Sequence, residues 1–371
     1  MSKEQQFKYI TYGAKASAER ITHLLDHFTD LYFSGVGLPT PLCVWGMHGI
    51  GKTELIRDYT KSKGYQFVYI APAQFEEMGD LIGMPKIETH GESTATRFIP
   101  PEWVPTIEGP GIFLIDDVNR ADDRILRGIM QLLQNYELVS WRFPAKWMIV
   151  LTANPDGGDY SVTTMDDAML TRMIHVTMEF DVKAWARWAE QAEVDPRGID
   201  FVLAYPEIIN GTRTTPRSLV QFFRAIHNIS DLKQNLDLVK ALADGCLDME
   251  TAVAFINFVN MDLDKIVAPE QILGAPDFKM IAGQLRDSVD GKTKRMDILS
   301  VIMTRLTNHV VHRGEKLDDK SFDNLKSFIL LPFIPNDLRL AMAQELVSSN
   351  KAELKKLYAV PEIGKLILTK M

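Results

Sequence analysis

The feature that most constrains the fold is the stretch GMHGIGKTE, at residues 46 to 54. It matches the pattern G-x-x-x-x-G-K-[ST], and it follows the apolar run LCVW and precedes a helix-like stretch. In this context the pattern indicates a loop whose backbone N–H groups surround phosphate oxygens. Lys52 would reach the β- and γ-phosphates of ATP, and the Thr53 hydroxyl would bind Mg²⁺. The residues expected to contact the nucleotide are Gly46, Met47, His48, Gly49, Ile50, Gly51, Lys52, Thr53 and Glu54.

Three further apolar runs have the length of buried strands. They are QFVYIA at 66–71, GIFLID at 111–116 and WMIVLTA at 147–153. Helical patterns separate them, and another helix is expected from about Ala14 to Phe33. Continuous apolar strands that alternate with helices are typical of a parallel sheet covered on both faces. We therefore expect an α/β nucleotide-binding core over residues 1–180.

The rest of the chain shows almost no strand-like runs. Stretches such as TPRSLVQFFRAIHNI and METAVAFINFVNM repeat apolar residues at helical spacing. We predict a helical lid domain at 181–276 and a further C-terminal helical region at 277–371.

Two acidic residues follow the predicted strand at 111–116. Asp116 would stand at its carboxyl end, where it can hold Mg²⁺ through the water shell of the ion. Asp117 would orient or deprotonate the attacking water. The alternative is that these residues only cap the next helix.

Charge and composition limit the remaining functions. The formal net charge of −8 gives no general attraction to nucleic acid, which is the less favoured partner. The N-terminal stretch is polar where a signal peptide needs an apolar core, and the apolar run FILLPFI is far shorter than the roughly 20 residues of a membrane span. We expect a cytoplasmic protein with free thiols at Cys43 and Cys246.

Four stretches in a fixed order, GMHGIGKTE, GDLIGMP, FLIDDVNRA and VLTANP, resemble the MoxR-type AAA+ ATPases. The resemblance extends from about Ala14 to Arg224. It implies a P-loop AAA+ core, a helical lid and assembly into a hexameric ring. One departure is Asp117, because the family usually has Glu there. Asp is one methylene shorter, so slow ATP hydrolysis is expected.

The resemblance also assigns roles to polar residues outside the loop. Asn154 corresponds to the sensor that contacts the γ-phosphate or the attacking water; the alternative is a turn before Pro155. Arg172 corresponds to the arginine finger that enters the site of the neighbouring subunit. Arg217 corresponds to the second sensor, acting in its own subunit or across the interface, and Arg120 is a further inter-subunit candidate. For Arg172 and Arg217, the alternative is an ordinary surface arginine.

Insertions in this family face the central pore of the ring or the partner. Two segments match such insertions here, residues 74–104 and the hairpin-like ELVSWRFPAKW at 137–147. Trp103, Trp141 and Trp147 would suit contact with another protein if exposed. They would equally suit the core, and the sequence does not separate these readings.

The leading hypothesis is an ATP hydrolase whose ring remodels or matures a protein client. By resemblance, the leading partner is a protein with a von Willebrand factor A domain. One alternative is a nucleic-acid motor or clamp-loader-like subunit, for which the cluster KTKR at 292–295 is the local support. Another is a slow switch that binds ATP and barely hydrolyses it, which Asp117 favours.

Overall fold

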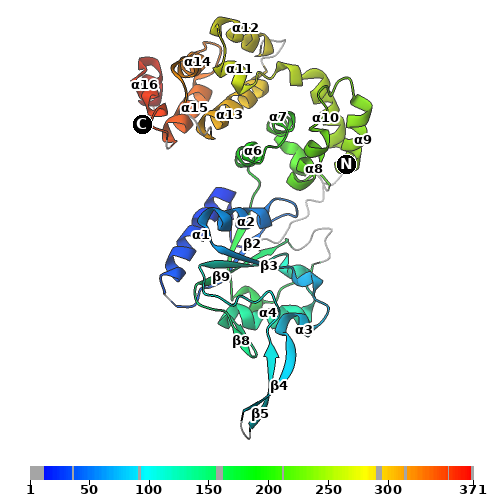
Figure 1. Ribbon diagram of the computed structural model, residues 1–371. Helices are drawn as coiled ribbons and strands as arrows, with labels where there is room; N and C mark the ends of the chain where they lie inside the picture. Colours follow the sequence, from blue (N-terminus) through cyan, green and yellow to red (C-terminus); the bar gives the residue numbers. More distant parts are fainter. Residues whose placement is uncertain are drawn as a thin grey trace. The chain divides into compact units, whose positions relative to one another are not determined.

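Figure 1 shows the computed structural model, which describes residues 12–35, 37–90, 93–155, 162–210, 213–289, 295–312, 316–349 and 351–368. The chain forms two compact units, Met1–Asp181 and Val182–Met371, and each is described by itself. The finer division into domains at 1–180, 181–276 and 277–371 stays a prediction.

The first unit is built on a parallel sheet of six strands in the order β1-β10-β2-β9-β6-β3. The strands are β1 (Ala14–Ala16), β2 (Leu42–Trp45), β3 (Gln66–Ile70), β6 (Gly111–Ile115), β9 (Trp147–Ala153) and β10 (Ile174–Met178). Every residue of β2, β6 and β9 is buried, because these strands lie inside the sheet and both of its faces are covered. The predicted α/β class, with a parallel sheet between helices, is confirmed.

Helices cover both faces of this sheet (Figure 1). They are α1 (Ala18–Phe33), α2 (Lys52–Lys63), α3 (Met78–Ile82), α4 (Asp123–Asn135) and α5 (Asp167–Leu170). Successive strand residues point to opposite faces. Leu42 and Val44 therefore belong to the core that contains residues of α1 and α2, whereas Cys43 and Trp45 belong to the core that contains residues of α3 and α4.

Two strands of this sheet, β1 and β10, were not predicted from the sequence. The first has only three residues, and the second alternates polar and apolar side chains. The helix expected from about Ala14 begins instead at Ala18. Ser17 caps it, since the Ser17 Oγ accepts a hydrogen bond from the backbone N of Arg20 at 3.3 Å.

Two antiparallel hairpins are inserted between strands of the sheet. One pairs β4 (Met84–His90) with β5 (Ser93–Ile99), and the other pairs β7 (Glu137–Leu138) with β8 (Trp141–Arg142). In Figure 1 the β4–β5 hairpin extends away from the sheet. The described residues of the long segment at 74–104 therefore form a structured insertion.

The three tryptophans near these hairpins pack inside the first unit. Trp141 and Trp147 are buried, and Trp103 is partly buried. Their indole nitrogens donate hydrogen bonds to backbone oxygens of Ile82, Ile107 and Asp80, respectively. Of the two readings left open by the sequence, contact with another protein is wrong for Trp141 and Trp147, because both side chains are buried in the core of the first unit.

The described residues of the second unit form helices joined by turns and loops, with no strand among them. Its helices are α6 (Val182–Gln191), α7 (Pro196–Ala204), α8 (Pro216–Ile226), α9 (Leu236–Cys246), α10 (Met249–Met261), α11 (Pro269–Leu273), α12 (Phe278–Val289), α13 (Met296–His312), α14 (Asp319–Ile329), α15 (Asn336–Ser348) and α16 (Pro361–Leu368). Aromatic rings fill part of its core: Phe255 lies 5.0 Å from Phe201 and 4.8 Å from Phe222, between ring centroids. Among the residues described in either unit, no helix is both long and apolar enough to cross a membrane.

Candidate functional site

The loop between β2 and α2 turns through backbone conformations that glycine adopts most easily. Gly49 has a φ of 70° and Gly51 a φ of 103°, both in the left-handed region. The backbone N of Gly46 donates to the carbonyl oxygen of Ala153 at 3.2 Å, which ties the start of the loop to β9. Lys52 is the first residue of α2, so the positive end of a 12-residue helix faces the loop.

The Lys52 side chain is buried beneath this loop. Its Nζ donates to the carbonyl oxygens of Gly46 at 2.7 Å and Met47 at 3.2 Å, and to the Asn154 Oδ1 at 3.1 Å. These three acceptors are neutral oxygens, and they hold a buried ammonium group inside the turn. The glycine turn and the start of α2 above this ammonium group fit a phosphate group at this loop.

Oxygen atoms suited to Mg²⁺ meet next to the loop. The Thr53 Oγ1 donates to the Asp116 Oδ1 at 2.7 Å. The same carboxylate oxygen accepts from the Thr152 Oγ1 at 2.6 Å, and the other accepts from the Tyr69 hydroxyl at 3.2 Å. Burial and the Asp116 charge raise the pKa of Tyr69, so the phenol remains a donor. Mg²⁺ commonly takes one or two protein oxygens with phosphates and water, a set that Thr53 and Asp116 fit.

Asp117 lies beside this pair in a left-handed backbone conformation, with a φ of 48°. Its backbone N donates to the Thr152 Oγ1 at 2.8 Å, and its Oδ1 accepts from the Asn154 Nδ2 at 2.9 Å. Its Oδ2 lies 3.3 Å from the Arg120 Nε. The Asp117 side chain makes no capping hydrogen bond, so the helix-cap alternative does not describe it. Asp122 caps α4 instead.

Asn154 connects the loop lysine to Asp117. The side chain is fully buried, with its Oδ1 on Lys52 and its Nδ2 on Asp117. A turn-forming asparagine before Pro155 would need neither contact. The position therefore fits a polar sensor at the carboxyl edge of the sheet, where β2, β6 and β9 all end.

Sequence reasoning missed three residues of this network: Tyr69, Asn119 and Thr152. Asn119 is fully buried, and both polar atoms of its side chain bond to the backbone of Asn154. Thr152 accepts from the backbone of Asp117 and donates to Asp116. The available signal was a polar side chain inside or beside an apolar run, as in FLIDDVNRA and WMIVLTA.

Arg172 lies at the opposite edge of the sheet. It precedes β10, whose first residue, Ile174, pairs with Leu42 at the start of β2. The loop follows the end of β2, so the length of that strand, roughly 15 Å or more with the flanking residues, separates Arg172 from its own loop. The Arg172 guanidinium donates to Gln134 at 3.3 Å and to the carbonyl oxygen of Ala168. A role in catalysis therefore requires the loop of another copy.

The other two predicted arginines have different surroundings. Arg120 pairs with Asp117 of its own chain at 3.3 Å, and its inter-subunit role stays a prediction. Arg217 is exposed in the first turn of α8, in the second unit. Glu54, at the end of the loop motif, is also exposed and pairs with Arg57 at 3.2 Å.

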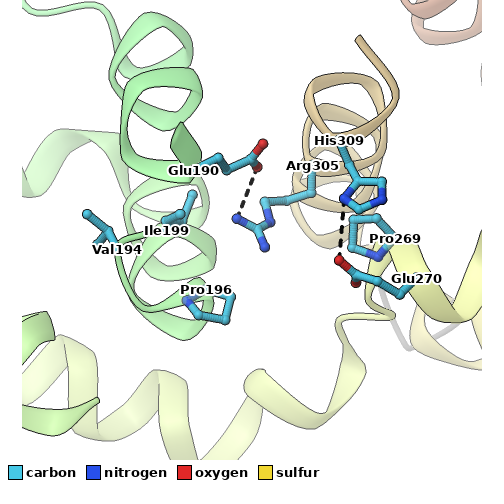
Figure 2. Close-up of a pocket in the computed structure, with 8 residues that line it drawn as sticks. All are labelled: Glu190, Val194, Pro196, Ile199, Pro269, Glu270, Arg305 and His309. Atoms are coloured by element: carbon cyan, nitrogen blue, oxygen red, sulfur yellow. Dashed lines mark ion pairs between the residues drawn. The ribbon is translucent and has the colours of Figure 1, made fainter. Parts of the chain in front are cut away.

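A second polar site lies within the helical unit (Figure 2). It is a cavity of about 180 Å³ lined by Glu190, Val194, Pro196, Ile199, Pro269, Glu270, Arg305 and His309. Arg305 lies 3.0 Å from Glu190 and 3.2 Å from Asp200, whereas His309 lies 3.3 Å from Glu270. The Arg305 pairs are close in distance, but their N–H groups are not aligned for hydrogen bonds. One guanidinium thus faces two poorly solvated carboxylates.

This cluster predicts a pH-dependent stability. Burial raises the pKa of Glu190 to about 7 and that of Asp200 to about 6, although Arg305 lowers both. Between about pH 4 and pH 7 the folded chain holds protons on these carboxyl groups that the unfolded chain has released. The free energy of unfolding is therefore highest, as far as these groups contribute, below about pH 4, and it falls as the pH rises toward 7. Glu190→Gln should therefore raise the melting temperature at pH 8 but not at pH 4, with an effect on the order of 2 kcal/mol.

The measurement is thermal unfolding of the full chain from pH 4 to 8, taken as the difference between the native protein and Glu190→Gln. Glu345→Gln is the control, because Glu345 pairs with Arg187 at 3.5 Å on a more exposed surface. Parallel curves for the native chain and Glu190→Gln would contradict a raised pKa of Glu190 in the folded chain.

Comparison with known proteins agrees with the geometry of the first site. Residues 41–173 match the model of the AAA domain of the dynein-related subfamily. This range includes the nucleotide loop and the acidic pair, and it extends to Arg172. This part of the chain is therefore similar to the AAA domains of AAA+ P-loop ATPases. The matched model does not identify the MoxR type, so the resemblance to MoxR-type ATPases stays a proposal.

No curated protein matches the chain. Among solved structures, the RuvB Holliday junction branch migration motor of Thermotoga maritima covers 83% of this chain and 94% of its own, at 14% identity and a TM-score of 0.37. Hsp104 in its closed state with ATPγS and FITC casein covers 61% and 46%, at 15% identity and a TM-score of 0.40. A putative ATPase from Cytophaga hutchinsonii covers 82% and 79%, at 11% identity and a TM-score of 0.32. At these scores the likenesses carry no argument about function.

Proposed function

We propose that this protein hydrolyses ATP in an oligomeric ring, taken here as a hexamer, and uses the energy to remodel or mature a protein partner. The observation that carries the proposal is the convergence of Lys52, Asp116, Asp117 and Asn154 at one edge of the sheet, with Arg172 at the opposite edge. A nucleotide at the loop would then meet its own subunit on one side, and Arg172 of a neighbour on the other.

The polar residues that meet at the loop of the first unit have distinct roles in this proposal. Lys52 binds the β- and γ-phosphates, while Thr53 and Asp116 hold Mg²⁺. Bound Mg²⁺ would neutralise charge on the phosphate oxygens. Asp117 orients the attacking water and accepts its proton, and Asn154 aligns Asp117 with the phosphate through the hydrogen bonds already present.

Arginines complete the site. Arg172 of a neighbouring subunit stabilises the charge that develops on the transferred phosphoryl group. Arg217, at the start of α8, is proposed as the second sensor, acting in its own subunit or across the interface, through which nucleotide state would move the helical unit.

The β4–β5 hairpin supports a protein client. Met84, Ile87 and Ile99 on this hairpin are 69%, 73% and 50% exposed, although all three are large apolar residues. Exposed apolar side chains grouped on one projecting element suit contact with another protein. By resemblance to MoxR-type ATPases, a protein with a von Willebrand factor A domain is the proposed partner.

The experiment that tests the proposal measures the mass of the purified protein with and without Mg-ATP, together with phosphate release. A ring that hydrolyses ATP, and whose turnover collapses in Arg172→Ala, supports it. A monomer with the same low turnover in the native chain and in Arg172→Ala contradicts the ring.

A second candidate, a slow ATP-dependent switch, is favoured by Asp117. Its carboxylate is shorter than the usual Glu, and both of its oxygens contact side chains of its own chain. The nucleic-acid alternative has less support. Residues 292–294 of its KTKR cluster lie outside the described residues, and Arg295 pairs with Asp297 at 2.7 Å and Asp262 at 2.8 Å.

Replacing Asp117 separates hydrolysis from binding. We expect Asp117→Asn to lower turnover about 10- to 100-fold, because general-base assistance is lost, while ATP affinity changes less than about threefold. Asp117→Glu should raise turnover if the short side chain limits it. Phosphate release at saturating ATP and calorimetric titration measure the two effects. Asp123→Asn, on the exposed surface of α4, is the control. Unchanged turnover in Asp117→Asn would remove Asp117 from this role.

A further inference from the structure

We propose that Asn119 is a positioning residue that sets the orientation of Asn154 toward the nucleotide. This inference rests on the proposed function, because it concerns the same site. Among the described residues, the Asn119 side chain forms its hydrogen bonds with Asn154 and not with Lys52, Asp116 or Asp117. It acts on the site only through the backbone of Asn154.

Two hydrogen bonds make this connection. The Asn119 Nδ2 donates to the carbonyl oxygen of Asn154 at 2.8 Å, and the backbone N of Asn154 donates to the Asn119 Oδ1 at 3.1 Å. Both residues are fully buried. One side chain thus satisfies the donor and the acceptor of a single buried peptide segment, which fixes the plane of that segment.

The connection is needed because the sheet ends just before Asn154. β9 stops at Ala153, whose partner is Trp45, so the strand ladder no longer holds the next residue. Asn119, which lies on a short 3₁₀ turn, Val118–Arg120, holds the backbone of Asn154 instead. The turn is itself held in place, because the backbone N of Thr163 donates to the carbonyl oxygen of Asn119 at 2.7 Å.

The same turn also determines where Asp117 lies. Asp117 is the residue immediately before it. A single rigid segment therefore positions the Asp117 carboxylate directly and the Asn154 amide through Asn119. The 2.9 Å hydrogen bond from the Asn154 Nδ2 to the Asp117 Oδ1, and the 3.1 Å bond from Lys52 to the Asn154 Oδ1, depend on this arrangement. If Asn119 is lost, the Asn154 side chain can rotate away from both.

The test is a double-mutant cycle on the full chain with Asn119→Ala and Asn154→Ala. Two quantities are measured. One is the turnover of ATP, and the other is the Kd of ADP divided by the Kd of ATPγS, with both Kd values obtained by calorimetry. Both depend on contact with the γ-phosphate region. If Asn119 acts through the Asn154 side chain, its removal should lower both about tenfold in the native background, and less than about twofold when Asn154 is already Ala.

A purely structural role gives a different result. Asn119→Ala would then lower both quantities by the same factor in the two backgrounds, which would overturn the proposal. Asn324→Ala is the matched control, because the buried Asn324 Nδ2 also bonds to two backbone oxygens, those of Leu273 and Ala275, in the helical unit. It should lower the melting temperature and leave the nucleotide ratio unchanged.

Failure of the proposed function is distinguishable from failure of this inference. A native chain that binds ATPγS without hydrolysing ATP would contradict the ATPase, but the affinity ratio would still report the coupling between Asn119 and Asn154. Equal ratios in the native chain, Asn119→Ala and Asn154→Ala would overturn the positioning role, even with normal hydrolysis in the native chain.

Discussion

Lys52→Ala is expected to weaken the binding of ATPγS with Mg²⁺ about 100-fold or more, and to abolish measurable ATP hydrolysis. The Lys52 ammonium is the buried cation beneath the loop, held by Gly46, Met47 and Asn154. Its removal takes away charge-assisted hydrogen bonds to phosphate, each worth roughly 1.5–3 kcal/mol. Calorimetric titration with ATPγS measures the loss directly.

The matched control is Lys61→Ala, which removes an exposed lysine from the last turn of the same helix, α2. It should bind ATPγS as the native chain does. Because Lys52 also bonds to the loop backbone, melting temperatures of the native and variant chains without nucleotide are compared first. Native affinity in a folded Lys52→Ala variant would mean that the loop does not bind phosphate.

The sequence was a good guide where local pattern and burial agree. Strands β2, β6 and β9 were predictable because each is a continuous apolar run, as buried parallel strands require. The loop was predictable because glycines with positive φ and a lysine at a helix start have few other uses together. The strands and the loop are both determined by residues that are neighbours in the sequence, so contacts between distant segments were not needed to predict them.

The remaining parts of the site depend on contacts between distant segments. Asn119 meets Asn154, and Thr152 meets Asp116, only because β6 and β9 pair side by side in the sheet. The burial of Trp141 and Trp147 likewise depends on packing that involves other segments, such as Ile82 and Ile107. Residue types alone could not separate these positions from exposed ones. Strand β1 was missed for a related reason, since its three residues acquire strand geometry only by pairing with β10.

Arg172→Ala is expected to lower ATP turnover about 1,000-fold while leaving ATPγS affinity within about threefold of the native value. The register of β10 and β2 places Arg172 at the sheet edge away from its own loop. Its contacts with Gln134 and Ala168 are those of a partly exposed side chain, so its removal should not unfold the domain. The loss would therefore arise in the active site of a neighbouring copy.

Mixing two inactive variants distinguishes action on a neighbour from action within one chain. Lys52→Ala subunits keep Arg172, and Arg172→Ala subunits keep the nucleotide loop. In an equal mixture that assembles at random, roughly a quarter of the interfaces pair an intact loop with an intact arginine, so about a quarter of native turnover should return. Co-purification through a tag on one variant verifies mixed rings, and Asp117→Asn subunits serve as a second donor of Arg172. If mixed rings hydrolyse no more ATP than the two variants measured separately, Arg172 does not act across an interface. Assembly into a ring would then not be needed to complete the active site.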